Sequence, residues 1–170
     1  MKIHRENQVK MEGSATLPGQ DPVWNMAPGR VVALKLQNQQ TGQRVMAFEE
    51  VTPTGTATPL HLHHDSDEVM YVLIGQYSFK IGDQTISGGP GTCVFMPRGI
   101  PHAWKYVGDG TGRAFIFYTP GEAGKAFEEA VKLQGPVTPS ISVEDNPFLP
   151  LGDAQILDRY GWEVVGPPPF

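Results

Sequence analysis

Short apolar runs separated by glycine and proline turns limit most strongly how this chain can fold. The 170 residues include 20 glycines and 16 prolines. Turn sequences lie at 82–83, 88–90 and 108–110, and no helical repeat of apolar residues joins the runs between them. We expect strands at 31–36, 44–48, 69–74, 77–81, 92–96, 102–107 and 113–118. This pattern predicts an all-β sandwich or barrel, and the jelly roll is one of the few such architectures.

The two ends of the chain differ from this central part. Proline and glycine at 18–19, 22 and 28–29 exclude a long helix, so an irregular arm is expected over residues 1–29. After Pro120, apolar residues recur at helical spacing, which predicts a helix over 121–134 and a shorter one over 153–160. We therefore expect a single domain, with the arm at 1–29, the barrel at 30–120 and a C-terminal segment at 121–170 packed on it.

Composition argues against several classes of function. The net charge of −5 and the absence of a basic cluster argue against nucleic acid as a partner. The longest apolar run, at 69–74, is too short to cross a membrane, and no apolar segment of a secretory signal follows Met1, so a cytoplasmic protein is expected. Cys93 is the single cysteine and lies in a strand-like run, where we expect a buried thiol.

Two motifs carry the residues suited to chemistry. The first is Gly55, five residues, His61-Leu62-His63, four residues, Glu68, six residues and Gly75. The second follows after fifteen residues: Gly91, five residues, Pro97-Arg98-Gly99, two residues and His102. Together they supply three imidazoles and one carboxylate, a donor set suited to a divalent transition metal with open coordination positions.

Strand geometry explains the spacing. Residues two apart on a strand face the same side, so His61 and His63 project together. An isolated carboxylate at Glu68 in an apolar barrel would be costly to desolvate, and neutral imidazoles cannot offset its charge, whereas a divalent cation can. The predicted ligands are thus His61, His63, Glu68 and His102. His64 points the other way and His4 lies in the arm, so neither is expected to be a ligand.

The two motifs resemble those of the cupin superfamily, and the first matches position for position. The resemblance implies a small jelly-roll barrel (a double-stranded β-helix) with a metal inside, held by the four residues named above. Where the family often has asparagine, this chain has Tyr106, which changes the expected pocket shape but no ligand. The tail over 159–168 also resembles single-domain bacterial cupins grouped as quercetin-dioxygenase-like.

A pocket for a small molecule is expected beside the metal. If alternation holds, its walls include Met70, Val72, Phe95, Trp104 and Tyr106, which would suit a hydrophobic or aromatic substrate with an enol, phenol or keto oxygen. The metal, which could be iron, manganese, nickel, cobalt or zinc, would polarise that oxygen.

Three functions follow from this site. The first is a quercetinase-like dioxygenase that consumes dioxygen, in which the resemblance implies that Glu68 is both ligand and proton acceptor. The second is a redox-silent isomerase or polyketide-type cyclase, and the third is a cupin that binds a small molecule without turnover. Cupins commonly dimerise, and the run at 31–36 could pair across a subunit boundary, so a homodimer is also expected.

Overall fold

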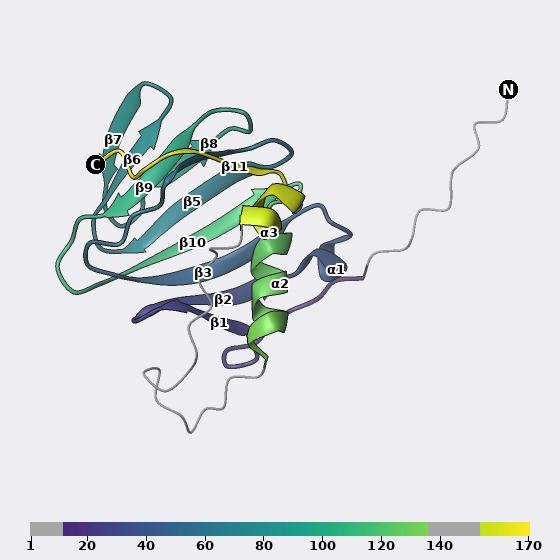
Figure 1. The fold of residues 1–170 in the computed structure, drawn as a ribbon. Helices are drawn as coiled ribbons and strands as arrows, with labels where there is room; N and C mark the ends of the chain where they lie inside the picture. The colour runs from purple at the N-terminus through teal and green to yellow at the C-terminus, as the bar shows by residue number, and fades with distance from the viewer. Residues whose placement is uncertain (1–11, 136–153) are drawn as a thin grey trace, which may run out of the picture.

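In the computed structural model, which describes residues 12–135 and 154–170, two antiparallel β-sheets face each other (Figure 1). The first sheet has six strands, in the order β1 (Val23–Ala27), β2 (Arg30–Leu36), β3 (Met46–Pro53), β10 (Thr111–Thr119), β5 (Asp67–Ile74) and β8 (Cys93–Met96). The second has five, in the order β11 (Trp162–Gly166), β4 (Leu60–His63), β9 (His102–Tyr106), β6 (Tyr77–Ile81) and β7 (Gln84–Gly88). The architecture is the predicted all-β jelly roll.

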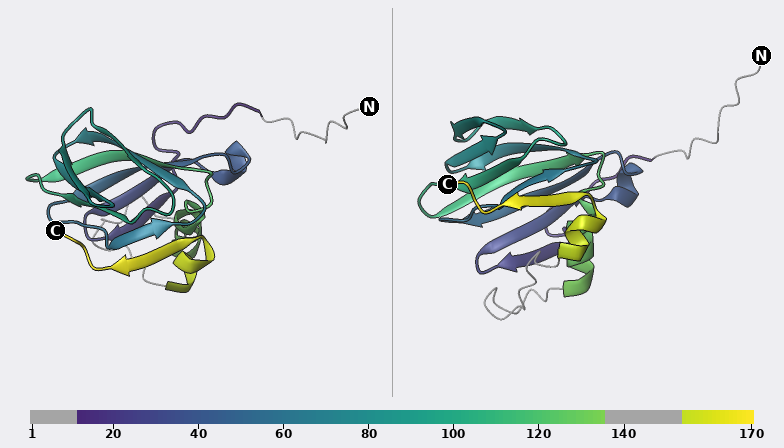
Figure 2. Two further views of the ribbon diagram at one scale, coloured as in Figure 1. Left: turned by 90° about the horizontal axis from the view of Figure 1, so that it is seen from above. Right: turned by 45° about the horizontal axis from the view of Figure 1, so that its top comes forward.

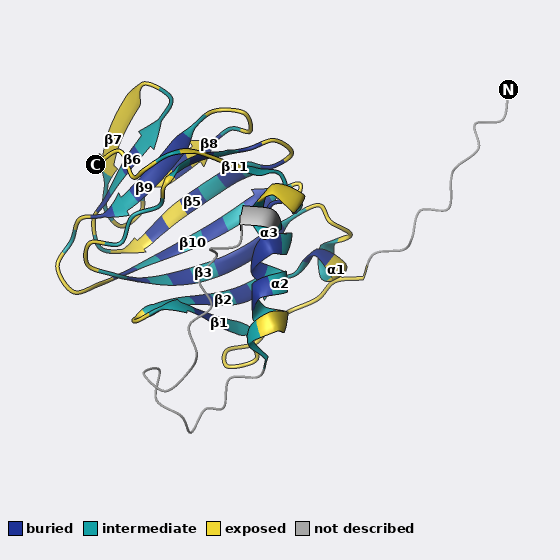
Figure 3. Ribbon diagram, in the orientation of Figure 1, coloured by how far each residue is buried: buried dark blue, intermediate teal, exposed yellow. Residues whose placement is uncertain are grey.

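Alternating burial along the strands places the core between the sheets. Every second residue of β10 is buried, and β3, β5 and β9 also bury most of their inward positions, as the dark blue bands in Figure 3 show. The largest fully buried side chains include Trp24, Phe48, Phe79 and Met70. Their burial supplies the main apolar contribution to folding.

The Tyr106 ring fills part of the barrel interior beside glycines, whose lack of a Cβ atom leaves room for it. A Cβ on Gly75 would lie 2.4 Å from the Tyr106 ring, and one on Gly112 would lie 2.7 Å from it. The phenol hydroxyl donates to the carbonyl oxygen of Asp109 at 2.9 Å. Gly75 also has φ of +90°, which favours glycine. These glycines therefore make room for the phenol of Tyr106.

Most of the predicted strands are confirmed, with shifted ends, but three strands were not expected. Residues 23–27, assigned to an irregular arm, form β1, because the turn at 28–29 returns the chain as a hairpin with β2. The run at 84–88 is largely exposed and so lacked an apolar signal, yet it pairs with β6 as β7. The third is β11, which pairs with β4 across nearly one hundred residues of sequence, a distance that no local pattern reports.

The expectation that Cys93 is a buried thiol is wrong. Cys93 pairs with Tyr71, which lies on the outer face of β5, and paired residues share a face of the sheet. Its side chain is therefore exposed.

Over residues 12–135 and 154–170, three helices lie outside the sheets: α1 (Asn38–Thr41), α2 (Lys125–Gln134) and α3 (Ala154–Arg159). The predicted helix over 121–134 begins later than expected, and α3 lies within the predicted range 153–160. Figure 2 shows α2 and α3 side by side at one edge of the molecule, where Glu129 of α2 binds Arg159 at 3.0 Å. Among the described residues, no helix is long and apolar enough to span a membrane.

Candidate metal centre

The four predicted donors come from three strands that face the same interior space. On β4, His61 and His63 are buried and Leu62 is turned away from them. His61 lies directly opposite His102 of β9, with ring centroids 4.6 Å apart. Glu68 reaches the same place from β5 in the other sheet. Their ligand atoms all lie within 4.8 Å of one another, so the structure brings the four residues together.

Glu68 stands between two of the histidines. Its Oε2 lies 3.0 Å from Nε2 of His63 and 3.3 Å from Nε2 of His102. Burial by itself would raise the pKa of Glu68, but the hydrogen bonds from His102 and His63 outweigh it and hold that pKa well below its usual range. Glu68 is therefore a buried anion.

Backbone carbonyls fix which nitrogen of two histidines carries the proton. Nδ1 of His61 lies 2.8 Å from the carbonyl oxygen of Pro59, and Nδ1 of His102 lies 2.8 Å from that of Ile100. A carbonyl oxygen can only accept, so both Nδ1 atoms must donate. In the neutral form, each Nε2 then presents its lone pair to the interior, as metal-binding histidines require.

Burial keeps His61 neutral in acid. Burial, together with the charges of the neighbouring His102 and His63, lowers the pKa of His61 to about 3. Burial also lowers the pKa of His63. His102 differs: burial lowers its pKa, but its hydrogen bond to Glu68 and the charge of that carboxylate raise it more, and the net shift is upward.

These residues fit a divalent transition metal. The Nε2 atom of His61 is buried and has no hydrogen-bond partner among the described residues, an unfavourable arrangement for a lone pair unless something binds it. Two donors about 2.1 Å from one ion are separated by at most about 4.2 Å. Because the donor atoms lie within 4.8 Å, small side-chain rotations are enough to bring them to one cation.

Arg98, in the turn of the second motif, ties that motif to the first. Its backbone N–H and Nε both donate to Oδ1 of Asp67, at 2.9 and 3.1 Å, and its Nη2 donates to Oδ2 at 2.9 Å. These bonds lower the pKa of Asp67, the residue before Glu68. A further bond joins the N–H of Gly99 to the carbonyl of His63 at 2.8 Å. The two motifs are thus held in a fixed relation.

The C-terminal segment contributes a residue that sequence reasoning could not place. The Trp162 ring stacks on His61, with centroids 4.9 Å apart and planes 13° apart, and meets His63 edge-on at 4.2 Å. Its Nε1 donates to the carbonyl of Ala123 at 2.9 Å. Trp162 therefore packs directly against two histidines of the candidate metal centre. No local signal identified it, because only the pairing of β11 with β4 brings it there.

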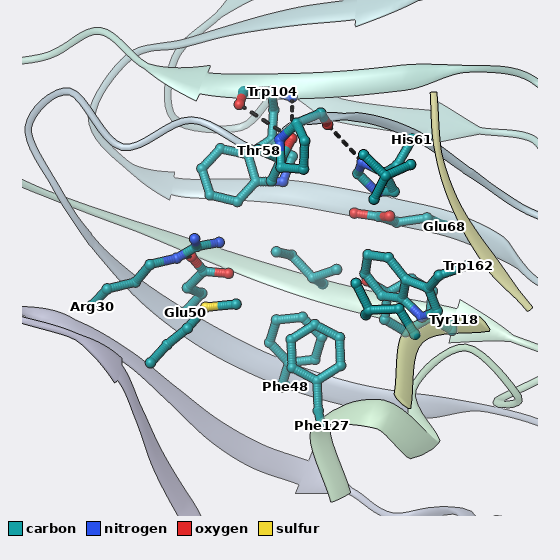
Figure 4. Close-up of a pocket in the computed structure, with 15 residues that line it drawn as sticks. Arg30, Phe48, Glu50, Thr58, His61, Glu68, Trp104, Tyr118, Phe127 and Trp162 are labelled. Atoms are coloured by element: carbon teal, nitrogen blue, oxygen red, sulfur yellow. Dashed lines mark hydrogen bonds and ion pairs between the residues drawn. The ribbon is translucent and has the colours of Figure 1, made fainter. Parts of the chain in front are cut away.

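A cavity of about 100 Å³ opens beside His61 and Glu68 (Figure 4). It runs between the two sheets, and its walls are mostly aromatic and aliphatic, with Phe48, Trp104, Ile116, Tyr118, Phe127 and Trp162 among the lining residues. Burial raises the pKa of Tyr118 well above its usual value, and the nearby charges of Glu68 and Glu50 raise it further. Tyr118 is therefore a protonated phenol within the cavity.

Of the five residues predicted to line the pocket, only one lies in the wall of this cavity. Trp104 lines the cavity. Met70, Val72 and Tyr106 face the interior but belong to the packed core rather than to this lining. Phe95 is 57% exposed and faces outward, so its prediction as a pocket residue is wrong. The reason is register: Glu68 pairs with Met96, which puts Met96 on the inner face and its neighbour Phe95 on the outer one.

Two histidines were expected to stand apart from the metal. His64 is exposed and pairs with Glu163 at 2.9 Å, as a surface residue. His4 lies outside the described residues.

Comparisons with known proteins agree with this geometry. Residues 47–118 match the family described as "Cupin domain". An uncharacterized protein of Methanocaldococcus jannaschii is 26% identical over 72 residues, which are 42% of this chain and 58% of that protein. The structure resembles that of KdgF from Halomonas sp., with a TM-score of 0.54 and 15% identity over 63% of this chain and 94% of that one.

A second similar structure is a predicted oxalate decarboxylase from Thermotoga maritima. Its TM-score is 0.51, with 19% identity over 53% of this chain and 79% of that one. At these identities, both structures establish the fold and not the reaction. The chain thus has the jelly-roll fold of these structures, and its residues 47–118 match the cupin domain family.

Proposed function

We propose that this protein is a metal-dependent enzyme that acts on a small hydrophobic or aromatic molecule bearing an enol, phenol or keto oxygen, as a dioxygenase. The observation that carries the proposal is the buried, unpartnered Nε2 of His61 at the wall of an aromatic cavity. Three histidines and one carboxylate would leave two positions on a six-coordinate first-row metal. Once bound, such a cation would polarise the substrate oxygen and lower its pKa.

The protein's own groups would supply orientation and proton transfer. His63 and His102 are fully buried, so a substrate would approach from the side of His61 and Glu68, which line the cavity. Glu68, which lines the cavity, is the proposed acceptor for the proton of the substrate hydroxyl. Phe48, Phe127 and Trp162 would exclude water and hold a flat apolar body.

A redox-silent isomerase or cyclase is the second candidate, and Tyr118 favours it. Its phenol lines the cavity beside Glu68 and stays protonated, so it could return a proton to an enolate carbon. Such a reaction needs no dioxygen, and zinc would serve it as well as iron.

Metal analysis and oxygen uptake separate the two candidates. We expect the purified protein to contain one iron, manganese, cobalt or nickel per chain, and to consume oxygen with at least one member of a panel of flavonols and other enolisable compounds. Stoichiometric zinc, with substrate conversion but no oxygen uptake, would favour the isomerase or cyclase. Absence of any bound metal after growth in a metal-supplemented medium would contradict both.

A further inference from the structure

The end of the cavity away from the metal cluster carries a buried ion pair that the proposed function does not use. Nε of Arg30, at the start of β2, donates to Oε1 of Glu50 at 2.7 Å. The side chains of Arg30 and Glu50 are only 14% and 2% exposed. The guanidinium carbon lies 5.3 Å from the centre of the Trp104 ring. Figure 4 shows the guanidinium across the cavity from Glu68 and His61.

Much of the hydrogen-bonding capacity of Arg30 is unused. Among the residues that the structure describes, Glu50 is its one hydrogen-bond partner, and the bond uses Nε. Arg30 lines the cavity, and its two terminal amino groups therefore keep their donors available for a ligand. Such a pair of coplanar N–H groups matches the two oxygens of a carboxylate.

Neighbouring side chains hold the guanidinium in place. Glu50 fixes Nε, and Trp104 lies against the guanidinium within cation–π distance. The backbone of Trp104 is itself held by Thr58, whose hydroxyl oxygen accepts from the Trp104 backbone N–H at 3.0 Å and whose backbone N–H donates to the Trp104 carbonyl at 2.9 Å. A group ordered in advance loses little entropy when a ligand binds.

The charge balance favours a ligand with a single negative charge. A divalent cation held by three neutral imidazoles and one carboxylate carries one positive charge in excess. Arg30 and Glu50 together are neutral, because Glu50 offsets the guanidinium. A monocarboxylate would neutralise the cavity, whereas a dianion such as a phosphate monoester would leave an excess negative charge out of water, which is costly.

We propose that the terminal amino groups of Arg30 bind a carboxylate of the substrate. The substrate class is then a monocarboxylic acid whose apolar or aromatic body lies along Phe48, Ile116 and Phe127, with its reacting oxygen at the end near His61 and Glu68. This inference rests on the proposed function and narrows it.

Binding of matched acids and amides tests the inference. The probe is 3-(3,4-dihydroxyphenyl)propionate, with its one-carbon shorter and longer homologues, each compared with its primary amide by isothermal titration calorimetry. The metal-free and the zinc-loaded protein are titrated in parallel. At least one acid is expected to bind about 10- to 100-fold more tightly than its amide, because the amide cannot form the charge-assisted pair. If no acid binds more tightly than its amide, the inference is overturned.

Variants separate recognition by Arg30 from a purely structural ion pair. Arg30→Met combined with Glu50→Gln leaves no buried charge unpaired and is expected to abolish the preference for the acid. Glu50→Gln alone frees the guanidinium and should strengthen acid binding several-fold. Arg113→Met is the matched control, because Arg113 pairs with Glu49, the neighbour of Glu50 on β3, and is expected to change nothing. An unchanged preference in the double variant would contradict the role of Arg30.

Comparing the titrations with and without zinc distinguishes this inference from the proposed function. Zinc is expected to tighten the acid and the amide alike, since both carry the catechol that can chelate it. Equal binding with and without zinc would count against the metal centre, even where the acid still binds better than the amide. Equal binding of acid and amide would count against Arg30, even where zinc strengthens both.

Discussion

The two ends of the cavity are both built from buried charged and aromatic side chains, but they are assembled differently. At the metal end, His61, His63 and Glu68 lie within eight residues of sequence, and His102 joins them through strand pairing. At the other end, Arg30 and Glu50 lie twenty residues apart with no motif around them. Local alternation therefore encodes the first end, whereas sheet register alone creates the second.

The register on β3 shows how selective the second end is. Val32 of β2 pairs with Glu50, so Arg30, two residues earlier on the same face, lies diagonally across from Glu50. The adjacent Glu49 points to the other face, where it binds Arg113. Of two neighbouring glutamates, one thus enters the cavity and the other remains outside the barrel. A shift of one residue would exchange them.

The largest expected effect is loss of metal from the first end. His61→Ala and His102→Ala should each weaken metal binding by more than about 100-fold, because each removes a ligand and not merely a neighbour of one. Metal content after dialysis and a competition titration would measure this. His64→Ala, on the surface, and Glu50→Gln, at the other end, should retain the metal. If both His61→Ala and His102→Ala kept all of their metal, the assignment of these histidines as ligands would be wrong. The two ends of the cavity would then not differ in metal binding.

Replacing Trp162 tests whether the C-terminal strand belongs to the metal end. Trp162→Ala should lower the free energy of unfolding by about 2 kcal/mol, since it removes a ring stacked on His61 and a hydrogen bond to Ala123. Trp162→Phe keeps a ring but loses the hydrogen bond, and should lower the free energy of unfolding by about 1 kcal/mol. Chemical denaturation of the metal-free protein gives both values. Equal stability of all three proteins would show that β11 packs there without stabilising the site.

The two ends should respond to acid with opposite sign. The pKa of His61 in the folded protein is about 3, so below about pH 6.5 the unfolded chain takes up a proton that the folded chain refuses. In the metal-free protein, His61 should therefore reduce stability by about 1.4 kcal/mol per pH unit between pH 6.5 and 3. For Glu50, burial raises the pKa more than Arg30 lowers it, so its protonation on acidification favours the folded state.

Denaturation at a series of pH values measures these slopes. His61→Gln should remove this contribution, so that stability falls by about 1.4 kcal/mol less per pH unit between pH 6.5 and 3. Glu50→Gln removes the stabilising protonation of Glu50. Stability should therefore fall more steeply with acidification in the interval just above pH 4.5. Parallel curves for wild type and both variants would show that neither group titrates as its surroundings indicate.

The smallest effect is expected at the link between the motifs. Arg98→Lys keeps the charge beside Asp67 but loses the paired N–H donors, and should weaken metal binding by less than about tenfold. Arg113→Lys makes the same change on a pair outside the site and should leave metal binding unaffected. A loss as large as that of a ligand variant would mean that Arg98 holds the turn before His102 in place.

Sequence alone determined the strand-rich fold and the set of four candidate donors. Turn residues mark where strands end, and alternation with period two specifies which neighbours share a face, so both signals are local. Tertiary structure decided the rest: that Phe95 faces outward, that Arg30 meets Glu50, and that Trp162 covers His61. Each depends on which strands pair and in what register, a choice set by long-range packing that no short stretch of this chain records.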